Sequence, residues 1–99
     1  MHGMRARTAH FIDHDRLVLL MQARVLDLLY QRGRGGSICP SEAARSLAGE
    51  IGVNWHALMR LVRSVASGLS HVGRIEVCQH GRSVDINEAR GPVRLRLKR

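Results

Sequence analysis

Aromatic side chains are scarce in this chain. Its 99 residues include one Phe, one Tyr and one Trp, too few to build the stacking platforms that bind single-stranded nucleic acids. Trp55 is the one large aromatic anchor available to a core that must otherwise be built from aliphatic side chains. An aliphatic core in a chain of this length indicates a single, helix-rich domain.

Long hydrophobic runs and paired cysteines are absent as well. No apolar run approaches the roughly 20 residues that span a bilayer, and residues 1–8 lack the apolar segment of a secretory signal. We therefore expect a cytoplasmic protein that does not bind membranes. Cys39 and Cys78 are far apart in sequence and form no CxxC pair, which favours free thiols over a disulfide or a zinc site.

Acidic residues are outnumbered by basic ones. The chain has 16 Lys and Arg residues against 8 Asp and Glu, a formal net charge of +8, which is typical of proteins that bind nucleic acids. Lys98 is the only lysine. All the others are arginines, whose planar guanidinium suits bidentate contacts with phosphate and guanine. An alternative explanation is that a genome rich in G and C encodes arginine in place of lysine.

Motifs of catalysis and metal binding are missing. The sequence shows no activated serine, no paired carboxylates and no glycine-rich loop followed by the lysine of a phosphate-binding loop. His10, Asp13 and His14 have a spacing that suggests part of a metal site, but helix capping explains Asp13. Cys78 and His80 lack a second pair of ligands. We expect no enzymatic activity, no metal, no cofactor and no small-molecule substrate.

Two helices are expected in the first half of the chain. Apolar residues recur at helical spacing from Asp15 to Gln31, and an aspartate at position 13 or 15 can cap this segment. A second helix is expected from Pro40 to about Leu47, because proline favours the first helical position. Cys39 precedes it and Glu42 follows three residues later, which is the spacing of a capping box with sulfur in place of the usual hydroxyl.

A third helix is expected from Trp55 to about Ser70, with Asn54 as its N-cap and a turn before it. Apolar residues at helical spacing mark its buried face: Trp55, Leu58, Met59, Val62, Ala66 and Leu69. Polar side chains fall on the opposite side, within an arc of about 80° when each residue advances roughly 100°: His56, Arg60, Arg63, Ser67 and His71, with the small Ser64 beside them. This stripe is expected to face solvent.

Two strands are expected near the C-terminus. Apolar and polar residues alternate from Arg74 to Gln79 and again from Val93 to Lys98, which is the period of half-buried strands. The polar face of the second strand carries a positive row: Arg94, Arg96 and Lys98. Glu76 on the first strand could pair with one of these across the sheet.

The order of these elements indicates a small α+β domain with the winged helix-turn-helix fold, in which three helices accompany a short antiparallel wing sheet of two or three strands. Residues 1–14 are expected to form a loosely ordered arm, and residues 15–99 the domain. The connection between the strands would be the wing. It carries Arg82 and Arg90 and is too long for a tight hairpin.

Several blocks of sequence carry a resemblance to a known family. They are Ile38 to Glu42 with Ala44 and Arg45, Trp55 with Leu58, Met59, Val62 and Arg63, Gly73 to Ile75, and Arg90 to Leu95. In these blocks the chain resembles a bacterial family, domain of unknown function 3253, for which a winged-helix fold is predicted. The resemblance implies the fold and brings no catalytic residues with it. Members commonly carry a basic residue before the wing glycine, where this chain has His80.

A basic helix-turn-helix favours a DNA-binding protein, such as a transcriptional regulator or a nucleoid-associated factor, because the second helix of this motif enters the major groove. The expected contacts with duplex DNA are His56, Arg60, Arg63, Ser64, Ser67, Arg82, Arg90, Arg94 and Arg96. The alternative is that the helical stripe is only a solvated helix face.

A protein-interaction or dimerisation module without DNA binding is the competing hypothesis. A second apolar line on the first helix, formed by Leu19, Leu26 and Tyr30, lies roughly 100° from the core-facing line. It could contact a second copy of the chain in a homodimer. If the helix is instead central in its own core, the same residues are buried in the monomer.

Overall fold

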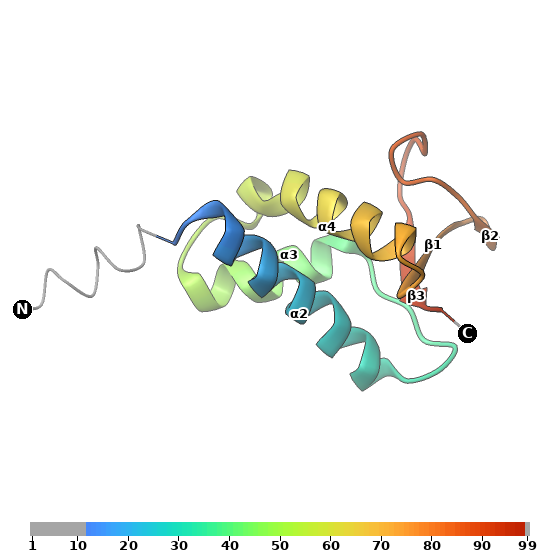
Figure 1. Ribbon diagram of the computed structural model, residues 1–99, viewed down its shortest axis with the longest axis horizontal. Helices are drawn as coiled ribbons and strands as arrows, with labels where there is room; N and C mark the ends of the chain where they lie inside the picture. The colour runs from blue at the N-terminus through green and yellow to red at the C-terminus, as the bar shows by residue number, and fades with distance from the viewer. Residues whose placement is uncertain (1–11, 99) are drawn as a thin grey trace, which may run out of the picture.

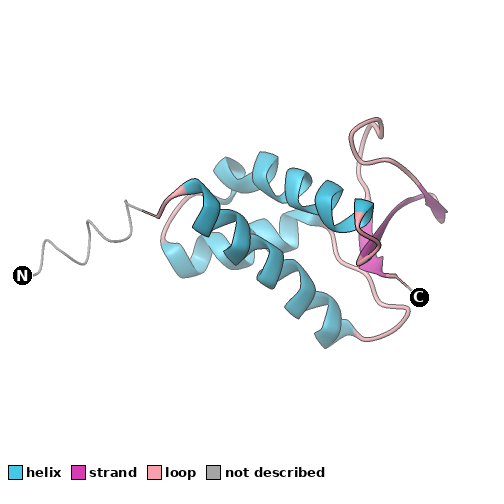
Figure 2. Cartoon of the chain, viewed as in Figure 1, coloured by secondary structure: helices cyan, strands magenta, loops and turns pink. Residues whose placement is uncertain are grey.

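The helices and strands follow the order expected from the sequence. The computed structural model describes residues 12–98. Its elements are α2 (His14–Arg32), α3 (Pro40–Ile51), the 3-10 helix η1 (Trp55–Leu58), α4 (Met59–His71), β1 (Ile75–Gln79), β2 (Arg82–Ser83) and β3 (Arg94–Leu97). The helices gather on one side and the strands lie at the end that holds the C-terminus (Figures 1 and 2). The prediction of a small α+β, winged-helix-like domain is confirmed.

The first helix starts within the arm that was expected at residues 1–14. Asp13 Oδ1 accepts a hydrogen bond from the Arg16 N–H at 2.8 Å and so caps α2, which begins at His14. Residues 1–11 lie outside the described range. None of the helices in residues 12–98 combines the length and the apolar character needed to span a bilayer.

α3 begins with the predicted capping box. Pro40 occupies the first helical position, and Glu42 Oε1 accepts a hydrogen bond from the Cys39 N–H at 3.0 Å. The helix continues to Ile51, beyond the expected end near residue 47. The reason is that Gly52, with a φ of 77°, adopts the left-handed conformation that ends helices, whereas the glycine at position 49 stays helical.

Glu42 also ties α3 to α2. Its Oε2 lies 2.6 Å from a terminal nitrogen of Arg32, in the last turn of α2. The hydrogen bond from the Cys39 backbone, together with the nearby Arg32 guanidinium, holds the pKa of Glu42 below its ordinary value of 4.5. The carboxylate therefore stabilises both the start of α3 and the contact between the two helices.

The third predicted helix is divided in two. Asn54 caps it as expected, because its Oδ1 accepts a hydrogen bond from the His56 N–H at 2.9 Å. The first turn, however, is the 3-10 helix η1. A 3-10 helix has 3.0 residues per turn instead of 3.6, so Trp55 is rotated by about 80° from its α-helical position relative to Met59. Trp55 is half-buried at the rim of the core, and its prediction as the central anchor was wrong.

The sheet has one strand more than the two that the alternation indicated. Its order is β2-β1-β3, all antiparallel. β2 exists because His80 and Gly81 both adopt positive φ, at 53° and 78°, the combination of a two-residue turn that suits the twist of a hairpin. A tight hairpin that the alternation did not indicate therefore joins β1 to β2, whereas the connection from β2 to β3 is long.

The core lies between the helices and the inner face of the sheet. On β1 and β3 the inward residues are Ile75, Val77 and Leu95, as the alternation predicted. Ile38, just before α3, forms a bridge with Leu95 and extends the sheet on its other edge. Ile86 and Val93 from the connection between β2 and β3 are also buried in the core. The wing segment is thus packed onto the domain.

We predict that Leu95→Ala destabilises the domain more than Trp55→Ala. Leu95 is fully buried, with Val77 opposite it on one side and Ile38 on the other. Truncating such a leucine costs about 2–5 kcal/mol. Trp55 is half-buried, so its removal leaves no enclosed cavity. Urea unfolding followed by far-UV circular dichroism measures both losses, and a larger loss for Trp55→Ala would contradict this assignment of the core.

The second prediction concerns acid. Because the pKa of Glu42 is lowered in the folded state, the stabilisation by its carboxylate is fully present above about pH 4.5 and is lost as the pH falls through the lowered pKa. Wild type should therefore be more stable than Glu42→Gln at pH 7, and this gap should be smaller at pH 3. Urea unfolding at both pH values tests it, with the exposed Glu88→Gln as control. A gap that does not change with pH would disprove the role of the carboxylate.

Candidate nucleic-acid interface

The start of the second helix of the motif presents an exposed polar surface. His56 of η1 and Arg60 and Ser64 of α4 are all exposed. Asn54 Oδ1 lies 2.9 Å from His56 Nδ1, and because an amide oxygen only accepts, Nδ1 is the donor in this hydrogen bond. Arg60 forms no ion pair within residues 12–98. Cationic and hydrogen-bonding groups are therefore available at the N-terminal end of α4.

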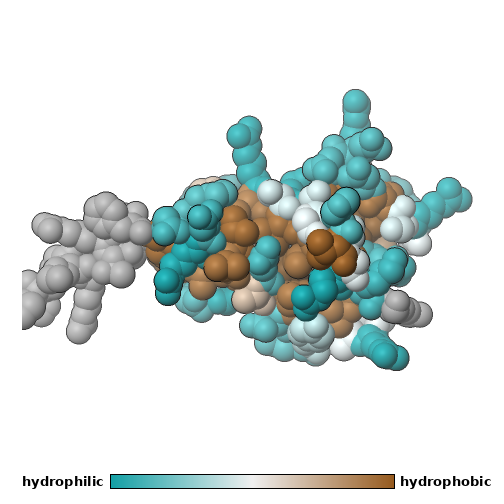
Figure 3. All heavy atoms as spheres, in the orientation of Figure 1, coloured by the Kyte–Doolittle hydropathy of each residue, from teal (hydrophilic) through white to brown (hydrophobic). Residues whose placement is uncertain are grey.

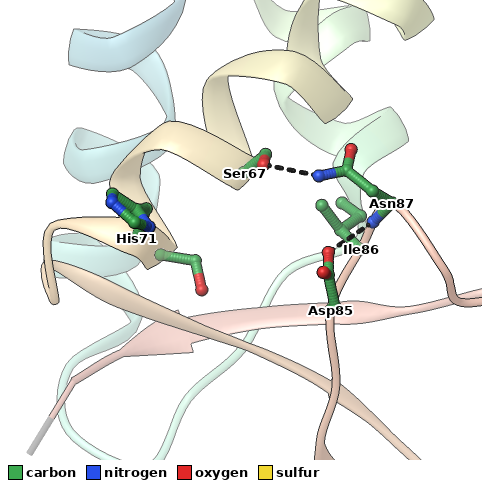
Figure 4. A pocket seen from close by; sticks show the side chains of 6 residues that line it. Ser67, His71, Asp85, Ile86 and Asn87 are labelled. Carbon is green, nitrogen blue, oxygen red and sulfur yellow. Dashed lines mark hydrogen bonds between the residues drawn. The ribbon is translucent and has the colours of Figure 1, made fainter.

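Further along α4, the wing segment covers part of the expected stripe (Figure 4). Asn87 Nδ2 donates a hydrogen bond to Ser67 Oγ at 3.0 Å, and the Arg63 guanidinium donates to the Ile86 carbonyl at 3.2 Å. Arg63 and Ser67 are half-buried as a result. The prediction that the whole stripe faces solvent was wrong, because helical periodicity identifies the side away from the helix's own core but not a distant loop that returns to cover it.

A polar pocket of about 240 Å³ lies between α4 and the wing segment. Ser67, Ser70 and His71 line it from α4, and Asp85 and Asn87 line it from the wing (Figure 4). Asp85 Oδ1 accepts a hydrogen bond from the Asn87 N–H at 2.8 Å, so this carboxylate orders the turn. In the part of the chain that the structure describes, no hydrogen bond joins His71 to a serine or to Asp85.

The positive row on β3 is largely engaged within the molecule. Arg94 donates to the hydroxyl and the carbonyl oxygen of Ser37, both at 3.0 Å, and to Cys39 Sγ at 3.3 Å. Arg96 pairs with Glu76 across the sheet at 3.4 Å, which confirms that Glu76 neutralises one member of the row. These two arginines join neighbouring segments of the sheet and have fewer N–H groups left for phosphate.

The remaining wing arginines are available. Arg82 in β2 and Arg90 in the following loop are exposed, and neither forms an ion pair within residues 12–98. Gln79 Nε2 donates to the carbonyl oxygens of Arg90 at 2.6 Å and Pro92 at 3.1 Å. The backbone that carries Arg90 is therefore held against β1, while its side chain projects from a fixed position.

Arg45 on α3 is a basic residue that periodicity alone does not single out. Its guanidinium carbon lies 4.4 Å from the centre of the Trp55 ring, a cation–π contact. The His56 ring stacks on the same indole, with 3.6 Å between the ring centres. Arg45 thus joins the polar surface at the turn between α3 and α4. Its proximity to Trp55 depends on how the two helices pack, so no local pattern could have indicated it.

The second apolar line of α2 is partly surface and partly core. Leu19 and Tyr30 are 64% and 58% exposed, whereas Leu26 is half-buried and packs against the core. Val72, just after α4, is 68% exposed. Figure 3 shows apolar side chains gathered over α2 on one face of the molecule. The exposed part of this apolar line therefore consists of Leu19 and Tyr30, and Leu26 contributes little to it.

The residues whose spacing suggested parts of a metal site do not form one in the described part of the chain. His10 lies outside the described residues, and Asp13 is used as the cap of α2. Cys78 is buried on β1 whereas His80 forms the exposed turn to β2. Within residues 12–98, no three His, Cys, Asp or Glu side chains come together as metal ligands.

Comparison with known families shows which family the chain belongs to but does not give an activity. No curated protein matches it. The model of a family described as "Protein of unknown function (DUF3253)" matches residues 19–98, from within α2 to beyond the end of β3. Because this match covers most of the chain, including every element of the interface described above, the protein belongs to the DUF3253 family of proteins of unknown function.

Proposed function

We propose that this protein binds duplex DNA through the start of α4 and through the wing, as transcriptional regulators and nucleoid-associated factors do. The observation that supports this most directly is the exposed group of His56, Arg60 and Ser64 on the second helix of a helix-turn-helix. In that motif the N-terminal residues of the second helix contact base edges in the major groove. Arginine bonds bidentately to guanine, and Arg60 has no carboxylate partner within residues 12–98 to compete.

The distribution of charge supports the same surface. Arg24, Arg32 and Arg96 are each neutralised by a glutamate. Four arginines lie exposed on the motif and the wing: Arg45, Arg60, Arg82 and Arg90. Cations at such positions neutralise phosphates and release counterions, which is the main source of affinity for non-specific DNA.

Arg63, Ser67 and Arg94 have a different role in this proposal from the one expected from the sequence. Arg63 and Ser67 dock the wing on α4, and Arg94 joins β3 to the segment before α3. They are positioning residues. By holding the helix and the wing together, they present both to DNA in one orientation and avoid the entropic cost of ordering a mobile wing on binding.

Four phosphate contacts predict that the logarithm of DNA affinity falls with the logarithm of salt with a slope of about 3.6, since each contact contributes about 0.9. Arg60→Ala should weaken binding and lower that slope by about 0.9 without unfolding the exposed site. Fluorescence anisotropy with a random duplex at several salt concentrations measures this. Arg16→Ala, an exposed arginine in the first turn of α2, is the matched control. Absence of salt-sensitive binding, or equal losses in both variants, would refute the proposal.

A homodimer through α2 is the second candidate, and the exposure of Leu19 and Tyr30 favours it. If the wild type is a dimer, Leu19→Glu should give a folded monomer, because Leu19 is exposed and not part of the core. Sedimentation velocity gives the mass and circular dichroism the helix content. The exposed Gln31→Glu on the same helix is the control. A wild type that remains monomeric at high concentration would eliminate this candidate.

A further inference from the structure

The outer face of the sheet, which none of the helices in residues 12–98 covers, contains a cavity of about 530 Å³. Its walls come from the segment before α3, from the β1–β2 hairpin and from the residues that lead into β3. Cys78 and Arg94 face it because they alternate along their strands with the inward residues Val77 and Leu95. The volume is within the range of about 300–1,000 Å³ that small-molecule sites occupy.

The charged side chains that line this cavity are all basic. They are Arg90, Arg94 and Arg96, and none of the Asp or Glu side chains in residues 12–98 lines it. Glu76 pairs with Arg96 at 3.4 Å, whereas Arg90 and Arg94 form no ion pair within residues 12–98. An anion in the cavity would therefore meet two guanidinium groups without a carboxylate partner. The cavity is therefore electrostatically suited to a negatively charged ligand.

The cationic groups are also held in place before any ligand arrives. Three of the five N–H groups of Arg94 donate to Ser37 and Cys39, which leaves the others to face the cavity. Gln79 fixes the backbone at Arg90. Arg96 pairs with Glu76 through one terminal nitrogen only, and its buried Nε has no hydrogen-bond partner. A preorganised guanidinium loses little entropy when it binds a planar carboxylate bidentately.

Apolar groups contribute to the rest of the wall. Pro92, Val93 and the free cysteines Cys39 and Cys78 line it, alongside the polar Ser37 and Gln79. Cys78 is only 6% exposed although it points away from the core. Such a wall favours a ligand with a hydrocarbon or aromatic body over a highly hydrated ion such as free phosphate.

We propose that this cavity binds a small organic acid, a carboxylate on an apolar body, with Arg90 and Arg94 as the groups that pair with the carboxylate. This site is separate from the start of α4 and does not depend on the proposed DNA binding. It gives a function to Arg94, whose guanidinium is held in place by Ser37 and Cys39.

The test compares benzoate with benzamide, which has the same shape but no charge. Both are titrated into the ¹⁵N-labelled full chain without DNA, and amide shifts are followed by NMR. Benzoate should give saturable shifts at Cys39, Cys78 and Val93, and benzamide should bind at least about tenfold more weakly, the loss expected for a charge-assisted hydrogen bond. Equal binding of the two, or benzoate shifts spread over all exposed arginines, would overturn the proposal.

Variants locate the anion contact. Arg90→Gln should weaken benzoate binding about tenfold, and it should fold because Arg90 is exposed. Arg94→Gln tests the second contact, but it also breaks the bonds to Ser37, so Arg90→Gln decides the outcome if Arg94→Gln unfolds. Arg60→Gln on α4 is the control and should bind benzoate as the wild type does. Unchanged benzoate affinity in Arg90→Gln would also overturn the proposal, whatever the protein does with DNA.

Discussion

β3 pairs through its backbone with β1 on one edge and with Ile38 on the other, and the rest of the structure depends on this pairing. Leu95 is fully buried and lies between Val77 of β1 and Ile38. Ile38 bonds to Leu95 in both directions through the backbone, at 2.9 and 2.8 Å. This pairing joins the two halves of the chain and fixes where α3 starts, since the next residue, Cys39, is its cap. The same pairing places Arg94, which precedes Leu95, within hydrogen-bonding distance of Ser37 and Cys39.

The basic side chains fall into two groups, those that contact other segments of the protein and those that do not form an ion pair. Some are bound inside the structure: Arg24, Arg32, Arg63, Arg94 and Arg96 contact carboxylates, hydroxyls, a carbonyl oxygen or a thiol of distant segments. Others form no ion pair within residues 12–98, and the 8 acidic residues of the chain cannot neutralise all 16 basic ones. Among these, Arg45, Arg60, Arg82 and Arg90 lie exposed on the helix-turn-helix and the wing, and Arg90 also lines the cavity of the outer sheet face.

The wing of this domain is a packed element and not a free loop. Ile86 enters the core, and two hydrogen bonds attach its neighbourhood to α4. As a result, Arg63 and Ser67 are only partly exposed. The same contacts fix the position of α4 relative to the segment that carries Arg82 and Arg90. Arg90 also lines the cavity of the outer sheet face, so the two proposed surfaces share this arginine.

The sequence by itself determined the order of the main helices and of β1 and β3 and, for most of their residues, the side that faces the core. These features depend on local chemistry: Asp13, Asn54 and Glu42 cap helices a few residues away, and alternation in β1 and β3 follows from strand geometry. Only the tertiary structure decided that Trp55 lies at the rim, that Arg45 rests on it, that the wing covers Arg63 and that Arg94 is bound to Ser37. Each of these depends on contacts between segments remote in sequence, and a period of two or 3.6 residues contains no information about which segment will return to cover an exposed face.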